Sequence, residues 1–359
     1  MNDPTPASKL QSVIRKLVAR NGLDDKEISE ALDIILAGLV SESAIAAFLV
    51  ALAMKGETAE EIRSVLLSIR KHATRISPNV KGSLIDTCGT GGDTVRSFNI
   101  STAAAIVASA AGAAVAKHGN RSVSGFCGSA DFLEYIGFDL DTPPAKIQSC
   151  IGSIGIGFLF APLFHPSMKN VALARKTIGI RTVFNMVGPL CNPCTNISSQ
   201  VIGVFEPSLL ETLSKACQGY INEAMIVHAH DGFDELSNTC ENDILWTMGD
   251  GQLRRMRLHP RLIGMHVAKP QQLVVDSKEE SIKSTLQTIY GEATAEKQDI
   301  VVLNAAAALV VGKVASDFRD GIELSREAIK RGNAQDKLMQ LVKYCGDVEK
   351  LKKAERKFL

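Results

Sequence analysis

Two glycine-rich segments, joined by an alanine-rich stretch, constrain the fold of this chain more than any other feature. The first, Gly89-Thr90-Gly91-Gly92-Asp93, follows the apolar run Leu84-Ile85, and the second, Lys117-His118-Gly119-Asn120-Arg121, follows the apolar residues 113–116. Consecutive glycines let backbone N–H groups point together at one anion, because no side chain blocks its approach. The cations of the second segment add charge that backbone amides lack. The order strand, glycine loop, helix, strand and basic loop therefore predicts an α/β fold that holds a polyphosphate.

The stretch between the two segments is expected to form a helix that strengthens the anion site. Ser101 or Thr102 is a suitable N-cap for a helix from residue 103 to about residue 112. The free N–H groups and positive dipole end of such a helix favour negative charge. Known phosphate motifs do not apply, since both the P-loop and the dinucleotide fingerprint require glycine where Thr94 stands. Either segment alone is explained as well by a tight turn, but the two together, with their charged side chains, favour a functional site.

Length and charge limit the class of protein. The chain has 359 residues, of which 45% are hydrophobic, enough for one large domain and a smaller one. Its formal charge of +1 provides no general field for nucleic acid or an anionic membrane. The N-terminus lacks the pattern of a secretion signal, and the longest apolar runs, 44–54 and 103–116, are too short to span a bilayer. We therefore expect a cytoplasmic protein whose partners are small molecules or a second copy of itself.

The cysteines indicate a reducing environment. Eight of them are spread along the chain rather than packed into a small scaffold, which is typical of reduced, mostly buried thiols. The pair Cys191 and Cys194 has the spacing of a redox pair or of half a zinc site. No second pair follows, so a loop with incidental thiols is the favoured interpretation.

The first eighty residues have the apolar periodicity of a helical unit. Thr58 followed by Glu61 has the pattern of a capping box, and Asp24 with Glu27 resembles one. Residues 44–54 are apolar nearly all round, which predicts packing against another part of the chain or another subunit. The predicted helical segments, separated by glycines at 22, 38 and 56, are 10–18, 28–36, 45–54 and 62–69.

From Leu84 onward, short apolar runs alternate with helical patterns, as they do in α/β domains. The predicted strands are 84–85, 113–116, 201–205, 224–227 and 301–303. Helices are expected from Pro143-Pro144 onward and over 168–177, 304–311 and 324–341, with a stop at 330–332.

Adjacent carboxylates follow one of the predicted strands. Asp234 and Glu235 lie in a turn just after the apolar segment 224–228. Acidic pairs are common on protein surfaces, but Mg²⁺ prefers a few carboxylates together with substrate phosphate oxygens. Their place after a buried strand, in a chain with a predicted polyphosphate site, favours a metal-binding role.

Several further motifs accompany the two glycine-rich segments in a defined order: Asn99-Ile100-Ser101-Thr102, Gly128-Ser129-Ala130-Asp131, Gly179-Ile180-Arg181-Thr182, Gly188-Pro189-Leu190 and Asp234-Glu235-Leu236. Together they resemble the anthranilate phosphoribosyltransferase family of tryptophan biosynthesis, over nearly the whole chain. The resemblance implies transfer of phosphoribosyl from phosphoribosyl pyrophosphate (PRPP) to the amino group of anthranilate, with release of pyrophosphate. This is the second step from chorismate to tryptophan.

The resemblance also implies an architecture. A small N-terminal helical domain covers 1–78, with a returning helical segment at about 168–188. A large α/β domain covers 79–167 and 189–359, with a central, mainly parallel sheet of the nucleoside phosphorylase and phosphoribosyltransferase type. A homodimer built through the helical domain is implied as well.

The motifs imply three sets of site residues and one metal cofactor, Mg²⁺. The implied metal ligands are Ser101, Asp234 and Glu235, and the implied anthranilate contacts are Gly89, His118, Asn120, Arg175 and Pro189. The planar fork of Arg175 matches a benzoate carboxylate, although an ordinary surface cation has the same sequence pattern. The implied PRPP contacts are Gly89, Gly92, Asp93, Ser97, Asn99, Ile100, Ser101, Thr102, Lys117, His118, Gly119, Asn120, Arg121 and Ser129.

No side chain is assigned as a catalytic nucleophile. Loss of pyrophosphate from ribose C1 develops negative charge on the leaving group, which amides and Mg²⁺ stabilise. An aromatic amine is largely neutral at pH 7, so it attacks without prior deprotonation. We therefore predict catalysis by positioning and electrostatics.

The chain departs from the family pattern at two places. Phe126-Cys127 stands where Lys-Ser is usual, which removes a cation from a loop expected to cover PRPP and predicts weaker PRPP binding or a differently closed loop. Cys191 and Cys194 replace small or polar residues, which affects the shape of the anthranilate channel.

Two alternatives have different consequences. A pyrimidine nucleoside phosphorylase shares the architecture, but Arg175 with Asn120 suits an aminobenzoate better than a nucleobase. A non-enzymatic, nucleic-acid-binding relative of the fold predicts a basic surface and needs no acidic metal pair, and this sequence shows the opposite on both points.

Overall fold

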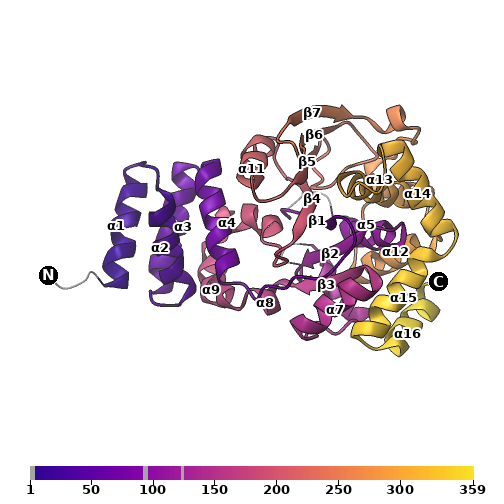
Figure 1. Ribbon diagram of the computed structural model, residues 1–359, viewed down its shortest axis with the longest axis horizontal. Coiled ribbons are helices and arrows are strands. Elements are labelled where there is room, and N and C mark those ends of the chain that lie inside the picture. Colours follow the sequence, from indigo (N-terminus) through magenta and orange to yellow (C-terminus); the bar gives the residue numbers. More distant parts are fainter. Residues whose placement is uncertain (1–4, 92–95, 123–124) are drawn as a thin grey trace.

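The computed structural model describes residues 5–91, 96–122 and 125–359. A group of helices forms one end of the molecule, and a larger α/β domain forms the rest (Figure 1). Both capping boxes are confirmed, because Asp24 and Thr58 each accept a hydrogen bond from the N–H of the glutamate three residues on. The helices of the first part are α1 (Pro6–Val18), α2 (Asp25–Leu36), α3 (Glu42–Lys55) and α4 (Ala59–Lys71).

The apolar helix α3 is covered from two directions. It buries Ile45, Phe48 and Leu49 and packs against α1 on one side and α9 (Lys169–Ile178) on the other. Helix α9 also contacts α2, and the short α10 (Val183–Val187) contacts α4. A segment distant in sequence therefore completes the packing of the N-terminal helices (Figure 1).

A seven-stranded sheet forms the centre of the α/β domain, in the order β3-β2-β1-β4-β5-β6-β7. The first five strands of this order are parallel, and β6 and β7 are antiparallel to their neighbours. The expected mainly parallel α/β sheet is confirmed. The strands are β1 (Leu84–Gly89), β2 (Ala114–Gly119), β3 (Ile156–Phe160), β4 (Ile197–Gly203), β5 (Glu223–Ala229), β6 (Asn242–Thr247) and β7 (Leu253–Leu258).

Helices enclose the sheet on both faces (Figure 1). On one face α5 (Ile100–Ala110) contacts β1 and β2, and α13 (Ala295–Val311) contacts β1, β4 and β5. On the other face α11 (Leu209–Cys217) packs against β5, β6 and α4. The remaining helices are α6 (Ser129–Tyr135), α7 (Pro144–Ile154), α8 (Ala161–Phe164), α12 (Lys278–Tyr290), α14 (Phe318–Lys330), α15 (Asn333–Cys345) and α16 (Val348–Phe358).

Two sequence predictions of local structure are wrong. Residues 301–303 are not a strand but part of α13, whose apolar run is buried on every side and so carries no helical periodicity. Helix α5 begins at Ile100 rather than Ala103, with Asn99 at the N-cap and no side-chain capping bond. The sequence also does not predict strands β3, β6 and β7. Within the described residues, no helix combines the length and the apolar character needed to cross a membrane.

Candidate active site

The glycine loop and the basic loop leave the same edge of the sheet. Strands β1, β2 and β4 are parallel neighbours that end at Gly89, Gly119 and Gly203. The Thr90 N–H donates to the Gly203 carbonyl at 2.9 Å, which ties the glycine loop to the end of β4. The carboxyl ends of parallel strands are the usual place for ligands in open α/β sheets. The topology therefore assembles one candidate site from loops that are distant along the chain.

An acidic loop packs directly onto the glycine loop. The Gly91 N–H donates to Asp234 Oδ2 at 2.7 Å, and Asp234 is 7% exposed. A Cβ at Gly89 would lie 2.1 Å from Asp234 Oδ2, and a Cβ at Gly203 would lie 1.4 Å from the Asp234 carbonyl oxygen. Neither position accepts a side chain, so these two glycines allow the carboxylate to approach. The sequence singled out Gly89, whereas the requirement at Gly203 emerges only in the fold.

The implied metal ligands come together. Ser101, Asp234 and Glu235 line one small pocket, to which Thr87 and Asn304 also contribute. Burial raises the pKa of Asp234, and the Gly91 N–H and the cations Lys117 and Arg181 oppose that rise. Among the described residues, no cluster of three or more His, Cys, Asp or Glu forms a metal site. Two carboxylates and one hydroxyl suit Mg²⁺ when substrate oxygens complete its shell.

A buried carboxylate organises the ends of β1 and β2. Asp86 is fully buried and accepts hydrogen bonds from the His118 N–H at 3.1 Å, Asn192 Nδ2 at 2.9 Å and Gln200 Nε2 at 3.3 Å. Burial raises its pKa, whereas the charge of Lys117 and the Asn192 amide lower it. Lys117 itself is buried and donates to the Thr87 carbonyl at 2.6 Å. Asp86 was not among the residues predicted from the sequence, although an aspartate inside an apolar strand before a glycine loop is a recognisable signal.

The loop with Cys191 and Cys194 links the two parts of the molecule. Arg70 of α4 donates to the carbonyls of Asn192 and Cys194, and its guanidinium lies 4.3 Å from the centroid of the Tyr220 ring. Both cysteines are free and buried, and burial raises the pKa of Cys191 to about 12. These thiols are protonated at neutral pH, which matches the interpretation of a structural loop.

Two neutral imidazoles lie beside the hydrogen bonds of Asp86. The ring centroids of His118 and His165 are 5.2 Å apart, and both residues are buried. Burial, followed by the neighbouring His165 and Lys117, lowers the pKa of His118 well below its usual value, and burial lowers that of His165 to about 4. His118 Nε2 has no hydrogen-bond partner in the described part of the chain. A neutral ring with an open nitrogen is able to accept a proton from a ligand. The sequence did not single out His165.

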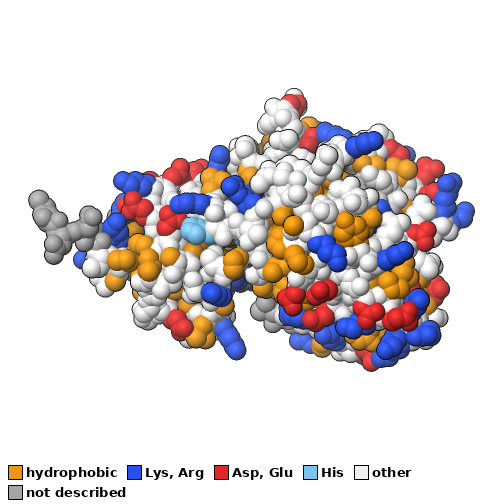
Figure 2. Space-filling view, turned by 60° about the horizontal axis from the view of Figure 1, so that its bottom comes forward, with side chains coloured by type: hydrophobic (Ala, Val, Ile, Leu, Met, Phe, Trp, Pro, Cys, Tyr) orange, Lys and Arg blue, Asp and Glu red, His pale blue; other side chains and the backbone are white. Residues whose placement is uncertain are grey.

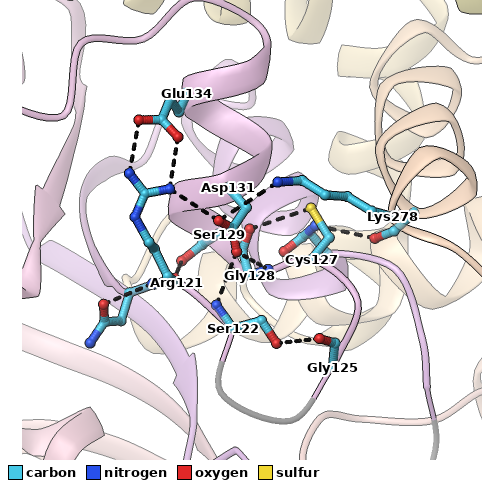
Figure 3. Close-up of polar contacts among 12 residues, drawn as sticks. Arg121, Ser122, Gly125, Cys127, Gly128, Ser129, Asp131, Glu134 and Lys278 are labelled. Carbon is cyan, nitrogen blue, oxygen red and sulfur yellow. Dashed lines mark hydrogen bonds and ion pairs between the residues drawn. The ribbon is translucent and has the colours of Figure 1, made fainter.

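The guanidinium of Arg121 points toward Glu134 and Asp131 of α6 (Figure 3). It forms a bidentate ion pair with Glu134 at 2.7 and 2.8 Å and a further contact with Asp131 at 3.1 Å. Asp131 also accepts from the N–H groups of Ser122 and Gly128 at 3.0 and 2.9 Å. In this arrangement the Arg121 charge orders the basic loop, and Lys117 is a buried cation of the same loop.

The other implied PRPP residues lie around the same loops. Asn99 reaches toward α12, with its N–H 3.2 Å from Thr285 Oγ1 and its Nδ2 3.4 Å from Ser281 Oγ. Ser129 Oγ donates to the Asn120 carbonyl at 3.2 Å. Ile100 and Thr102 are buried in the first turn of α5, and Ser97 forms a bridge with Val274. Gly92 and Asp93 lie outside the described residues.

The implied anthranilate contacts come from three elements. Pro189 is buried, and its carbonyl accepts from Gln200 Nε2 at 3.1 Å. Arg175 lies on α9, and burial lowers its pKa. Its guanidinium lies 5.6 Å from the Phe184 ring centroid, and no carboxylate of the described residues forms an ion pair with it. A partly buried cation without an anionic partner is suited to an anionic ligand.

The fold and this site define a glycosyl transferase with a helical bundle and an α/β domain. The description "Glycosyl transferase family, helical bundle domain" matches residues 11–73, and "Glycosyl transferase family, a/b domain" matches residues 81–335. Among curated relatives, the anthranilate phosphoribosyltransferase of Acetivibrio thermocellus is 45% identical over 93% of this chain and 96% of its own length. That of Desulfatibacillum aliphaticivorans is 43% identical over 92% and 97%. This chain belongs to the anthranilate phosphoribosyltransferase family.

Solved structures agree with this assignment. The anthranilate phosphoribosyltransferase of Thermus thermophilus superposes with a TM-score of 0.86 at 36% identity, covering 93% of this chain and 99% of that one. The Saccharomyces cerevisiae enzyme in complex with PRPP and Mg has a TM-score of 0.83 at 26% identity, covering 94% and 97%. The family assignment decides against both alternatives, a nucleoside phosphorylase and a non-enzymatic nucleic-acid-binding protein.

Proposed function

We propose that this chain transfers phosphoribosyl from PRPP to the amino group of anthranilate, giving N-(5-phosphoribosyl)anthranilate and pyrophosphate in tryptophan biosynthesis. The observation that supports this most directly is the contact of Gly91 with Asp234. It brings an amide-rich anion loop and a carboxylate pair to one edge of the sheet, which is the combination that a magnesium pyrophosphate requires.

The pyrophosphate half of PRPP is proposed to lie against the glycine loop and the N-terminus of α5. The N–H groups in the first turn of α5 stabilise the negative charge that develops on the leaving group. Lys117 adds a buried cation whose charge is little screened. The proposed PRPP contacts remain Gly89, Gly92, Asp93, Ser97, Asn99, Ile100, Ser101, Thr102, Lys117, His118, Gly119, Asn120, Arg121 and Ser129.

Ser101, Asp234 and Glu235 are proposed to hold Mg²⁺, since these three residues share one pocket. Bound there, Mg²⁺ neutralises charge on the leaving pyrophosphate. A chelator is expected to abolish turnover, and added Mg²⁺ is expected to restore it. Direct calorimetry of Mg²⁺ with pyrophosphate gives a second readout, in which Asp234→Asn weakens binding. Unchanged binding in that variant would contradict the assignment.

The acceptor side of the site is proposed to comprise Gly89, His118, Asn120, Arg175 and Pro189. Arg175 pairs with the anthranilate carboxylate and thereby orients the ring and its amine. His118, which is kept neutral by burial, is proposed to take the proton that the amine loses after it attacks. Since the amine is already neutral, we assign most of the rate enhancement to positioning and electrostatics.

A homodimer through the helical domain is part of the proposal, together with the domain boundaries 1–78 plus 168–188 and 79–167 plus 189–359. Large apolar side chains are exposed at this end of the molecule (Figure 2), where Val18, Leu39 and Met54 are 71%, 59% and 69% exposed. The proposal is that a second copy of the chain covers these side chains. Light scattering tests it, and Met54→Asp is expected to shift the protein to monomers. We also propose a cytoplasmic location, which suits eight free thiols.

The deciding assay follows the loss of anthranilate fluorescence after PRPP and Mg²⁺ are added. The proposed activity predicts a decrease that requires all three components and releases one pyrophosphate for each anthranilate consumed. An unchanged signal at high enzyme concentration would refute the proposed activity.

A further inference from the structure

Arg181 makes a close stacking contact across the two parts of the molecule. It follows α9 in the segment that packs against the N-terminal helices, whereas Phe205 follows β4 of the central sheet. The Arg181 Cζ lies 3.5 Å from the centroid of the Phe205 ring. A planar guanidinium stacks well on an aromatic face, and its N–H groups then lie at the edge of the stack.

Phe205 is itself bonded into the anion loop. Its N–H donates to Thr90 Oγ1 at 3.3 Å, and the Thr90 N–H donates to the Gly203 carbonyl at 2.9 Å. The neighbouring Gly91 holds Asp234. The backbone of Phe205 is therefore held beside the glycine loop, and the guanidinium of Arg181 stacks on its ring next to the same loop.

The charge of Arg181 lies near the acidic loop. The Phe205 ring on which it stacks belongs to a residue bonded to Thr90, and the next residue, Gly91, donates to Asp234. Arg181 brings positive charge from the segment that packs on the helical domain to the phosphate edge of the sheet.

We propose that Arg181, stacked on Phe205, is a positioning residue that directs a cation at the pyrophosphate half of PRPP. This inference rests on the proposed function and extends it. Because Arg175 precedes Arg181 on the same segment, one piece of chain then serves both substrates: Arg175 faces the acceptor carboxylate and Arg181 the donor phosphates. Each arginine is expected to control the affinity of one substrate.

Three variants separate charge from stacking. Arg181→Gln removes the charge, Arg181→Lys keeps the charge without the flat stacking surface, and Phe205→Leu removes the platform. Arg254→Gln is the matched control, because Arg254 is an exposed arginine on the distant strand β7. Calorimetry measures inorganic pyrophosphate binding in Mg²⁺, and steady-state kinetics measures KM for each substrate. Thermal unfolding without ligand shows whether each variant is folded.

We expect Arg181→Gln to weaken pyrophosphate binding and raise KM for PRPP by about tenfold, with KM for anthranilate unchanged. Arg181→Lys recovers part of that loss, Phe205→Leu gives an intermediate loss, and Arg254→Gln behaves as wild type. A change of less than about twofold in Arg181→Gln, or an equal rise in both KM values, overturns the inference. Failure of the proposed function itself is distinguishable, since wild-type protein then consumes no anthranilate.

Discussion

Replacement of Gly203 by alanine tests whether the close approach of the acidic loop is essential. A Cβ at this position would lie 1.4 Å from the Asp234 carbonyl oxygen and 2.2 Å from the Asp234 carbonyl carbon. These are backbone atoms, so no side-chain rotation relieves the clash. Reaching the 3.4 Å of ordinary contact requires the Asp234 carbonyl to move by about 2 Å.

The expected effect is larger on catalysis than on stability. Overpacking by one methyl group costs about 1–3 kcal/mol of unfolding free energy, which a chain of this size tolerates. A shift of about 1 Å in a catalytic group costs about 100-fold in rate, so Gly203→Ala is expected to lose at least that in kcat. Because Asp234 moves with its backbone, the concentration of Mg²⁺ needed for half-maximal activity is also expected to rise.

Gly249→Ala is the matched control for this prediction. Gly249 lies in the β6–β7 turn, and a Cβ there has its nearest neighbour, Glu223 Oε1, at 3.6 Å. Both variants are assayed by anthranilate fluorescence over a magnesium titration, with urea unfolding as the stability measurement. If Gly203→Ala retains a kcat within about threefold of wild type and the same magnesium dependence, the role assigned to this contact is wrong.

Three further predictions address the acceptor, pH and the loop at Phe126. Arg175→Met is expected to raise KM for anthranilate about 10–100-fold and to leave KM for PRPP unchanged, because a charged hydrogen bond is lost; equal effects on both substrates would count against it. His165 has a folded pKa of about 4, below the unfolded value, so its contribution to stability is complete above pH 6.5 and is lost as pH falls toward 4. Between pH 7.5 and 5, the free energy of unfolding measured in urea should therefore fall about 2 kcal/mol less for His165→Gln than for wild type. An equal fall in both proteins would refute this. Arg96 stacks on the Phe126 ring at 5.1 Å, so Phe126→Lys adds a second cation at this place. This variant is expected to lower KM for PRPP at least about threefold. An unaltered KM would contradict the effect expected of this loop.

Local chemistry made much of the fold predictable. The capping boxes at Asp24 and Thr58 depend on residues three apart, so the sequence alone reveals them. The core of strand β1 and the glycine loop after it were recognisable for the same reason. Residues 301–303 show the limit of this approach: inside a fully buried helix, the periodicity that distinguishes helix from strand is absent.

The candidate site also has one part that the sequence predicts and one part that only the fold determines. The sequence by itself determined the residue types: the glycines, Lys117, the pair Asp234 and Glu235, and Arg175, because motif order is a property of the chain. Only the tertiary structure decided their partners. In the structure, Arg121 pairs with Glu134, and Arg181 stacks on Phe205. Arg70 donates to the Asn192 carbonyl, and the Asn192 amide donates to Asp86.

The physical reason is the separation of these partners along the chain. Arg70 and Asn192 are 122 residues apart, and Gly91 and Asp234 are 143 apart, so no local pattern links them. Parallel strands need long crossover connections, yet they bring all their carboxyl ends to one edge. The sequence therefore determines which side chains are available for a site. The strand order β3-β2-β1-β4-β5 determines which of them lie close together.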